Sequence, residues 1–124
     1  MIHTVTILYV DDEPINLMLF EAMFKKSYNV ICAHSGLQGL NILAENPKIQ
    51  VIISDMKMPG MNGLEFIKKA RVLFPDILYF ILTGYEITPE IQSSLEQGII
   101  AEYFQKPFNM KSIELEIAKR LSIS

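Results

Sequence analysis

The chain has 124 residues, of which half are hydrophobic and a fifth are charged, and its formal net charge is −3. This length suits one domain, residues 1–124, and the composition is that of a packed globular domain rather than a disordered chain. Its weakly acidic balance excludes a basic surface for direct binding of nucleic acid or anionic membranes. No apolar run approaches the roughly 18–20 residues of a membrane span. The single cysteine, Cys32, forms no internal disulfide, which favours a cytoplasmic location.

Five short runs rich in β-branched and aromatic residues alternate with segments of helical period. The second to fourth runs are continuously apolar, as expected of parallel strands that are covered on both faces. The predicted strands are Val5–Val10, Asn29–Ala33, Val51–Ser54, Leu78–Leu82 and Ala101–Phe104.

The segments between these runs carry apolar residues at helical spacing, so each is predicted to be a helix with one apolar face. Asn62 and Glu65 resemble a capping box, and Thr88 precedes a proline at the first helical position. The apolar residues of the five predicted faces are Ile15, Met18, Leu19, Ala22 and Met23; then Leu37, Leu40 and Ala44 after Ser35; Phe66, Ile67, Ala70 and Phe74; Ile91 and Leu95; and finally Met110, Ile113, Ile117 and Leu121 after Asn109.

The order of elements is therefore (βα)₅, which predicts an α/β fold. Strict alternation with short connections implies right-handed crossovers and a parallel sheet between two layers of helices. In such open sheets, ligands bind beyond the carboxyl ends of the strands. The polar residues that follow the strands are consequently the candidate site: Asp11, Asp12 and Glu13, then Asp55, then Thr83 and Gly84, then Lys106 and Pro107.

Carboxylates gathered at one sheet edge repel each other unless positive charge lies among them. A hard cation with oxygen ligands supplies such charge, and Mg²⁺ usually keeps several waters beside its carboxylates. Lys106 could supply a second positive charge. Pro107 directly after it suits a tight turn, with a cis peptide bond as one option.

Each of these residues also has a simpler explanation. Asp12 could cap the helix that follows it, and Asp55 could be a turn residue before Pro59. Thr83 could be no more than a strand residue, and Lys106 a solvated surface lysine. These explanations account for single residues, but they do not account for the whole set at one predicted edge.

The pattern resembles the receiver domains of bacterial response regulators. The matching pieces are DDEP (residues 11–14), SDMKMPGMNG (residues 54–63), LTG (residues 82–84) and YFQKPF (residues 103–108), in that order and at the intervals of the family. The resemblance covers essentially the whole chain. It implies a flavodoxin-like (CheY-like) three-layer sandwich whose five-stranded parallel sheet has the order 2-1-3-4-5.

The resemblance also implies a function. The chain is expected to be a phosphoacceptor domain of a two-component phosphorelay, a signalling protein rather than an enzyme. Asp55 corresponds to the residue that takes a phosphoryl group from a histidine kinase or a phosphotransfer protein. Mg²⁺, or Mn²⁺ in its place, would be held directly by Asp12 and Asp55, mainly through water by Asp11, and by the backbone carbonyl of Lys57.

Further roles carry over by position. Lys106 matches the lysine that pairs with the phosphoryl group, Thr83 the hydroxyl that binds it, and Tyr103 the aromatic switch residue. The face made by the fourth helix, fifth strand and fifth helix is where the family couples to a downstream partner or output domain, or dimerises. Lys57 and Tyr85 depart from the commonest pattern, and both are expected to modulate the lifetime of the phosphorylated form.

Three other functions compete with this one. A Mg²⁺-dependent phosphohydrolase that forms an aspartyl phosphate typically has a second aspartate where this chain has Lys57. A flavodoxin-like FMN-binding protein would need a phosphate-binding loop where this chain has three acidic residues. A receiver-like interaction module that is never phosphorylated is opposed by the complete set of site residues.

Overall fold

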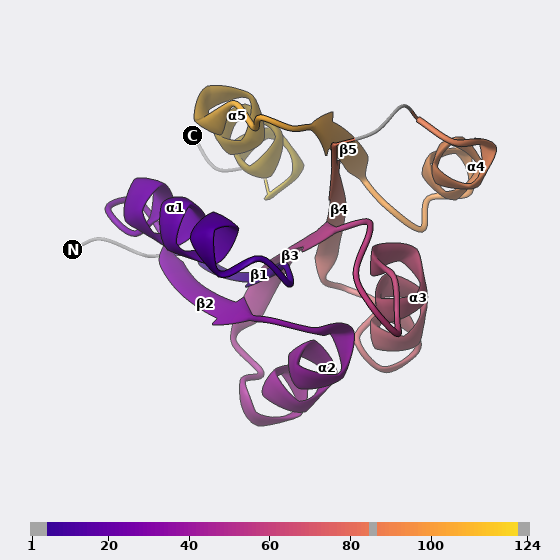
Figure 1. Cartoon of the computed structure of the whole chain (residues 1–124), viewed down its shortest axis with the longest axis horizontal. Coiled ribbons are helices and arrows are strands. Elements are labelled where there is room, and N and C mark those ends of the chain that lie inside the picture. Colours follow the sequence, from indigo (N-terminus) through magenta and orange to yellow (C-terminus); the bar gives the residue numbers. More distant parts are fainter. Residues whose placement is uncertain (1–4, 85–86, 122–124) are drawn as a thin grey trace.

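The computed structural model describes residues 5–84 and 87–121 and contains five strands that alternate with five helices in this part of the chain (Figure 1). None of these helices is long and apolar enough to cross a membrane. The elements are β1 (Thr6–Val10), α1 (Pro14–Phe24), β2 (Asn29–Ala33), α2 (Gly36–Glu45), β3 (Ile49–Asp55), α3 (Gly63–Leu73), β4 (Leu78–Thr83), α4 (Pro89–Glu96), β5 (Glu102–Gln105) and α5 (Met110–Leu121).

The strands form one parallel sheet in the order β2-β1-β3-β4-β5, as predicted. The β3 strand is longer than the predicted run and includes Asp55 as its last residue. The hydrogen-bonded backbone of the strand therefore fixes the position of the Asp55 Cα atom. The β2 strand, which was expected to be covered on both faces, lies at an edge of the sheet and is only partly buried.

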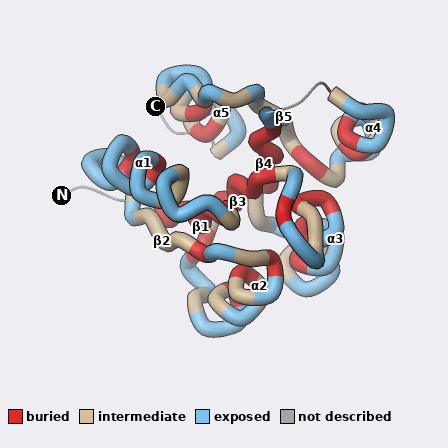
Figure 2. Tube along the Cα trace, viewed as in Figure 1, coloured by how far each residue is buried: buried red, intermediate tan, exposed pale blue. Residues whose placement is uncertain are grey.

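Helices cover both faces of the sheet because successive strand residues point to opposite sides. Ile7 and Tyr9 of β1 face the helices α1 and α5, whereas Leu8 and Val10 face α2, α3 and α4. The same alternation divides β3 and β4 between two apolar cores, one on each side of the sheet. Figure 2 shows the buried residues concentrated in the central strands and on the inner sides of the helices.

The predicted helix starts are confirmed at three helices. The Ser35 hydroxyl accepts a hydrogen bond from the backbone N–H of Gln38, and the Thr88 hydroxyl accepts one from that of Ile91. Asn62 and Glu65 form the reciprocal bonds of a capping box, at 2.9 and 2.8 Å. These caps satisfy amide groups that have no partner within their own helix.

The apolar residues predicted to form the buried face of α1 do lie on one side of the helix, but that side is exposed to solvent. The exposed fractions of Ile15 and Met18 are 69% and 70%, and Leu19 and Met23 are also exposed. The buried side instead carries Phe20 and Phe24, which stack on each other with ring centroids 4.1 Å apart. Phe20 also stacks on Tyr9 of the sheet with ring centroids 4.1 Å apart, and this aromatic packing decides which side of α1 faces the sheet.

The predicted face of α2 needs a smaller correction. Leu37 and Ala44 of α2 are exposed, and the helix approaches the sheet through glycine instead. A Cβ atom on Gly39 would lie 2.8 Å from the ring of Phe66, so a larger residue there would push α2 away from α3. In α4, Ile91 is fully buried and Leu95 packs against the same core, as expected of the predicted apolar face.

Candidate functional site

Two neighbouring strands bring buried carboxylates to the same edge of the sheet. Val10 of β1 pairs with Ser54 of β3, so the residues that follow them, Asp11 and Asp55, lie side by side. The exposed fractions of these residues are 0% and 6%. Asp12 is half-buried, and one carboxylate oxygen from each of the three aspartates lies within 4.8 Å of the others.

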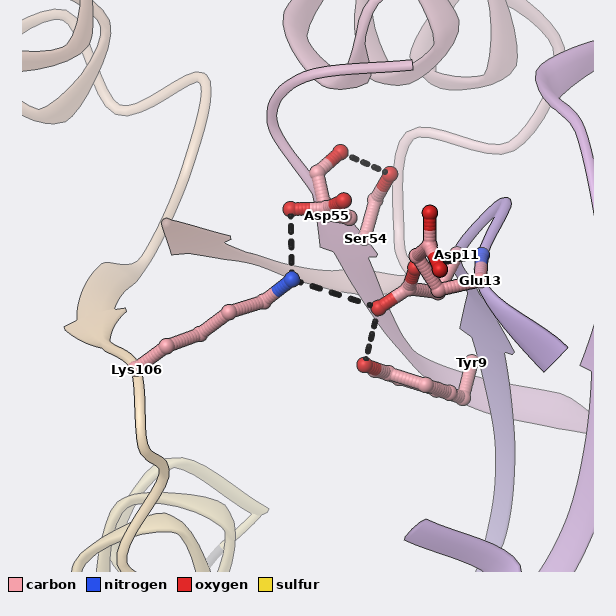
Figure 3. Close-up of polar contacts among 6 residues, drawn as sticks. All are labelled: Tyr9, Asp11, Glu13, Ser54, Asp55 and Lys106. Atoms are coloured by element: carbon pink, nitrogen blue, oxygen red, sulfur yellow. Dashed lines mark hydrogen bonds and ion pairs between the residues drawn. The ribbon is translucent and has the colours of Figure 1, made fainter. Parts of the chain in front are cut away.

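Lys106 follows β5 directly, and its side chain extends across the same edge of the sheet to these carboxylates (Figure 3). Its position follows from the register, because Gln105 of β5 pairs with Thr83 of β4. The Lys106 Nζ lies 3.1 Å from Asp55 Oδ1 and 3.4 Å from Asp11 Oδ2. The peptide bond between Lys106 and Pro107 is cis, which is one of the two isomers that the sequence left open.

The ionisation of these groups reflects burial and mutual repulsion. Burial raises the pKa of Asp55, the nearby charges of Asp11 and Asp12 raise it further, and Lys106 only partly opposes them. Burial alone would lower the pKa of Lys106, but the two carboxylates beside its amine outweigh this effect, and the net shift is upward. The three carboxylates therefore carry more negative charge than the amine of Lys106 neutralises.

This donor set fits a small divalent cation. The three aspartates offer hard oxygen ligands from one direction, which is how Mg²⁺ is usually held in proteins. A cation among them would remove the repulsion that raises the pKa of Asp55. The geometry also argues against the simpler explanation of Asp12, because the N-cap residue of α1 is Glu13, whose side chain makes no capping bond.

Asp11 has two further hydrogen-bond donors that sequence reasoning did not anticipate. The Tyr9 hydroxyl donates to Asp11 Oδ2 at 2.7 Å, and the backbone N–H of Glu13 donates to Oδ1 at 3.0 Å. The sequence does contain a signal for the first of these contacts. Tyr9 and Asp11 are two residues apart, and residues at this spacing in a strand point to the same side of the sheet.

The other predicted residues surround the same edge. Thr83, at the end of β4, is buried and 1% exposed, and Tyr103 of β5 is half-buried and packs against the core under α2, α3 and α4. Lys57 is exposed on the loop after β3. Tyr85 lies outside the described residues. An open pocket of about 360 Å³ holds much of the set and is lined by Asp12, Glu13, Asp55, Lys57, Gly84 and Lys106.

These contacts define a class of protein. A carboxylate at a strand end, with further carboxylates on one side and a lysine on the other, is equipped to receive a phosphoryl group. Residues 7–118 match the family model described as response regulator receiver domain. The chain belongs to this family, and it is a phosphoacceptor domain of the two-component signalling type.

Similar proteins agree with this assignment. Sporulation initiation phosphotransferase F of Bacillus subtilis is 36% identical over 118 residues, which are 94% of each chain. Response regulator protein TrrA of Thermotoga maritima, solved in complex with Mg²⁺–BeF, is 28% identical with a TM-score of 0.79, and the match covers 94% of this chain and 98% of TrrA.

Other relatives are much longer than this chain. Hydrogenase transcriptional regulatory protein HoxA of Cupriavidus necator is 29% identical over 103 residues, which are 83% of this chain but 21% of that protein.

The receiver family as a whole binds Mg²⁺ at an acidic pocket, and the cluster of Asp11, Asp12 and Asp55 is consistent with such a pocket.

Proposed function

We propose that Asp55 is the phosphoacceptor of this receiver domain. The observation that carries the proposal is the placement of its buried carboxylate 3.1 Å from the Lys106 amine and within 4.8 Å of the Asp11 and Asp12 oxygens. A carboxylate held between a cation site and an amine is positioned to attack phosphorus while the charge on the phosphoryl oxygens is neutralised.

The residues that would hold Mg²⁺ are Asp12 and Asp55 directly, Asp11 mainly through water, and Lys57 through its backbone carbonyl. Mn²⁺ offers similar oxygen chemistry and would substitute. The bound ion would supply positive charge to the phosphoryl oxygens and to the three carboxylates. The cluster of carboxylate oxygens and the raised pKa of Asp55 support this role.

The chain's own groups perform the transfer. A carboxylate oxygen of Asp55 forms a bond to phosphorus, and the bond from phosphorus to the donor's histidine nitrogen breaks, which leaves an acyl phosphate. The product adds about −1.5 to −2 charges. Lys106 follows this charge and pairs with a phosphoryl oxygen.

The switch involves Thr83 and Tyr103. Thr83 directly follows Leu82, the β4 partner of Asp55, and we assign its hydroxyl to a phosphoryl group on Asp55. Movement of Thr83 toward the group would open space for the half-buried Tyr103, two strands away from Asp55. A local electrostatic event would thereby select between two packing arrangements.

The partners follow from the chemistry of the family. A histidine kinase or a phosphotransfer protein donates the phosphoryl group in the cytoplasm. The face formed by α4, β5 and α5 passes the signal to a downstream partner or output domain, or to a second copy of the chain. Residues 1–124 act as one receiver unit, with no direct contact to nucleic acid or membrane.

A phosphorylation assay tests the proposal. Incubation of the chain with acetyl phosphate and Mg²⁺ should add the mass of one phosphoryl group, and fragmentation should place it on Asp55. Removal of the metal with EDTA should prevent the addition, because the phosphoryl charge would then meet unneutralised carboxylates. Steady release of phosphate from an ester would instead favour the phosphohydrolase. A chain that stays unmodified would be an interaction module.

Lys57 is expected to change the lifetime of the phosphorylated form. Its side chain lines the pocket that contains Asp55, and it carries a cation that can reach the phosphoryl group. Substitution Lys57→Ala should therefore change the dephosphorylation rate by about twofold to fivefold, as expected for one exposed charged contact. The measurement is loss of phosphoryl mass over time. Lys68→Ala, an exposed lysine on α3, is the control, and equal rates for Lys57→Ala and the native chain would contradict the prediction.

A further inference from the structure

Tyr9 contributes a polar group to a site whose other members follow the strands. Its side chain is fully buried beneath α1, and its hydroxyl donates a hydrogen bond of 2.7 Å to Asp11 Oδ2. The same oxygen is 3.4 Å from the amine of Lys106. Figure 3 shows both donors converging on this one atom, while the amine also reaches Asp55.

The two donors differ in how firmly they are held. The Tyr9 ring stacks on Phe20 with centroids 4.1 Å apart and planes 3° apart, and Phe20 stacks in turn on Phe24. This packing fixes the ring and therefore the direction of the hydroxyl. The amine of Lys106 stands at the end of a flexible chain, and 26% of its side chain is exposed. When a phosphoryl group arrives, Lys106 can move and Tyr9 cannot.

The movement of Lys106 would deprive Asp11 of a donor. Asp11 is 0% exposed and its other oxygen already accepts from the Glu13 N–H, so bulk solvent does not reach Oδ2, and the loss of a donor to this buried oxygen is costly. We propose that Tyr9 is a positioning residue for phosphorylation: its hydroxyl keeps Asp11 Oδ2 hydrogen-bonded and in place, which allows Lys106 to leave Asp11 for the phosphoryl group. This inference rests on the proposed role of Asp55 as the phosphoacceptor.

Tyr9→Phe tests the inference because it removes only the hydroxyl and retains the stacked ring. Tyr79→Phe is the matched control: Tyr79 is 2% exposed on β4, and its hydroxyl donates at 2.7 Å to the backbone oxygen of Phe74, away from the site. Tyr9→Phe should lose at least as much thermal stability as Tyr79→Phe, since the bond it loses is buried and made to a charged carboxylate. Only Tyr9→Phe should bind beryllofluoride, a phosphoryl mimic, more weakly in saturating Mg²⁺, by about tenfold, the factor for one net hydrogen bond.

Binding is followed by ¹⁹F NMR of the fluorides on the full chain. Tyr9→Phe affinity equal to or above that of the native chain would overturn the role of Tyr9, and any loss of stability would then reflect only the lost Tyr9–Asp11 hydrogen bond. Failure of the native chain to bind beryllofluoride would remove the phosphoacceptor assignment together with the inference. A second measurement needs no substitution: the Tyr9 hydroxyl proton should stay hydrogen-bonded and protected from exchange in the beryllofluoride complex, and its loss on binding would also overturn the proposal.

Discussion

Substitution Asp55→Asn is expected to abolish phosphorylation and, without Mg²⁺, to make the protein more stable at neutral pH. The amide cannot form the acyl phosphate, so no phosphoryl mass should be added by acetyl phosphate and Mg²⁺. The gain in stability follows from the raised pKa of Asp55, whose main cause is burial and whose second cause is the charge of Asp11. The measurements are mass spectrometry for the first effect and thermal unfolding for the second.

The pH dependence of this gain has a definite sign. Because the folded state raises the pKa of Asp55, the folded protein binds that proton more tightly than the unfolded chain does, and stability falls as pH rises through this range. Asp55→Asn should therefore be more stable than the native protein at neutral pH. This difference in stability should disappear under acid conditions, where the carboxyl is protonated in both the folded and the unfolded state. A gain of about 1 kcal/mol corresponds to roughly 3–6 °C in Tm.

In the presence of Mg²⁺, we expect the native protein to be more stable than Asp55→Asn, the reverse of their order without the ion. The native chain holds one more carboxylate for the ion, so added Mg²⁺ should stabilise it more than Asp55→Asn. Asp76→Asn, at an exposed position between α3 and β4, provides the control and should change neither property. A native protein that is more stable than Asp55→Asn without any divalent ion would show that the Lys106 ion pair outweighs burial and repulsion at this site.

Period and order were sufficient to predict the alternating α/β fold and the sheet edge that carries the candidate site, whereas the order of the strands came from the family resemblance. Asp11, Asp55, Thr83 and Lys106 each end or directly follow a strand, and the parallel arrangement of the strands brings them to one edge. That inference needs no knowledge of side-chain conformation. The capping residues were equally predictable, since a cap is a local interaction within three or four residues.

The errors occurred where two apolar patterns on one helix competed. In α1 the aliphatic residues Ile15 and Met18 form one stripe, and the aromatic residues Phe20 and Phe24 form another. Period alone cannot choose between them. The choice depends on Tyr9, whose ring on the opposing strand stacks with Phe20, and such a contact between distant residues is not visible in the order of the sequence.

Substitution Gly63→Ala is expected to be strongly destabilising and to disturb the site from a position that carries no functional group. Gly63 is the first residue of α3 and lies beside the end of β3, at Asp55. Its backbone N–H donates to the backbone oxygen of Met56 at 2.8 Å. A Cβ atom there would overlap the backbone oxygen of Asp55 and lie 3.0 Å from Met56 Cα. Backbone cannot yield as a flexible side chain can, so α3 or the end of β3 must shift.

The expected cost is roughly 3 kcal/mol, at the upper end of overpacking effects, and chemical denaturation would measure it. Gly60→Ala in the same loop separates crowding from backbone strain. Gly60 has φ +78°, but its added Cβ would meet nothing within 4 Å, so this variant should lose only about 1–2 kcal/mol. Gly63→Ala should also accept phosphoryl groups more slowly, because the backbone that positions Asp55 has moved. A Gly63→Ala variant with native stability would mean that α3 starts farther from Asp55 than the structure places it.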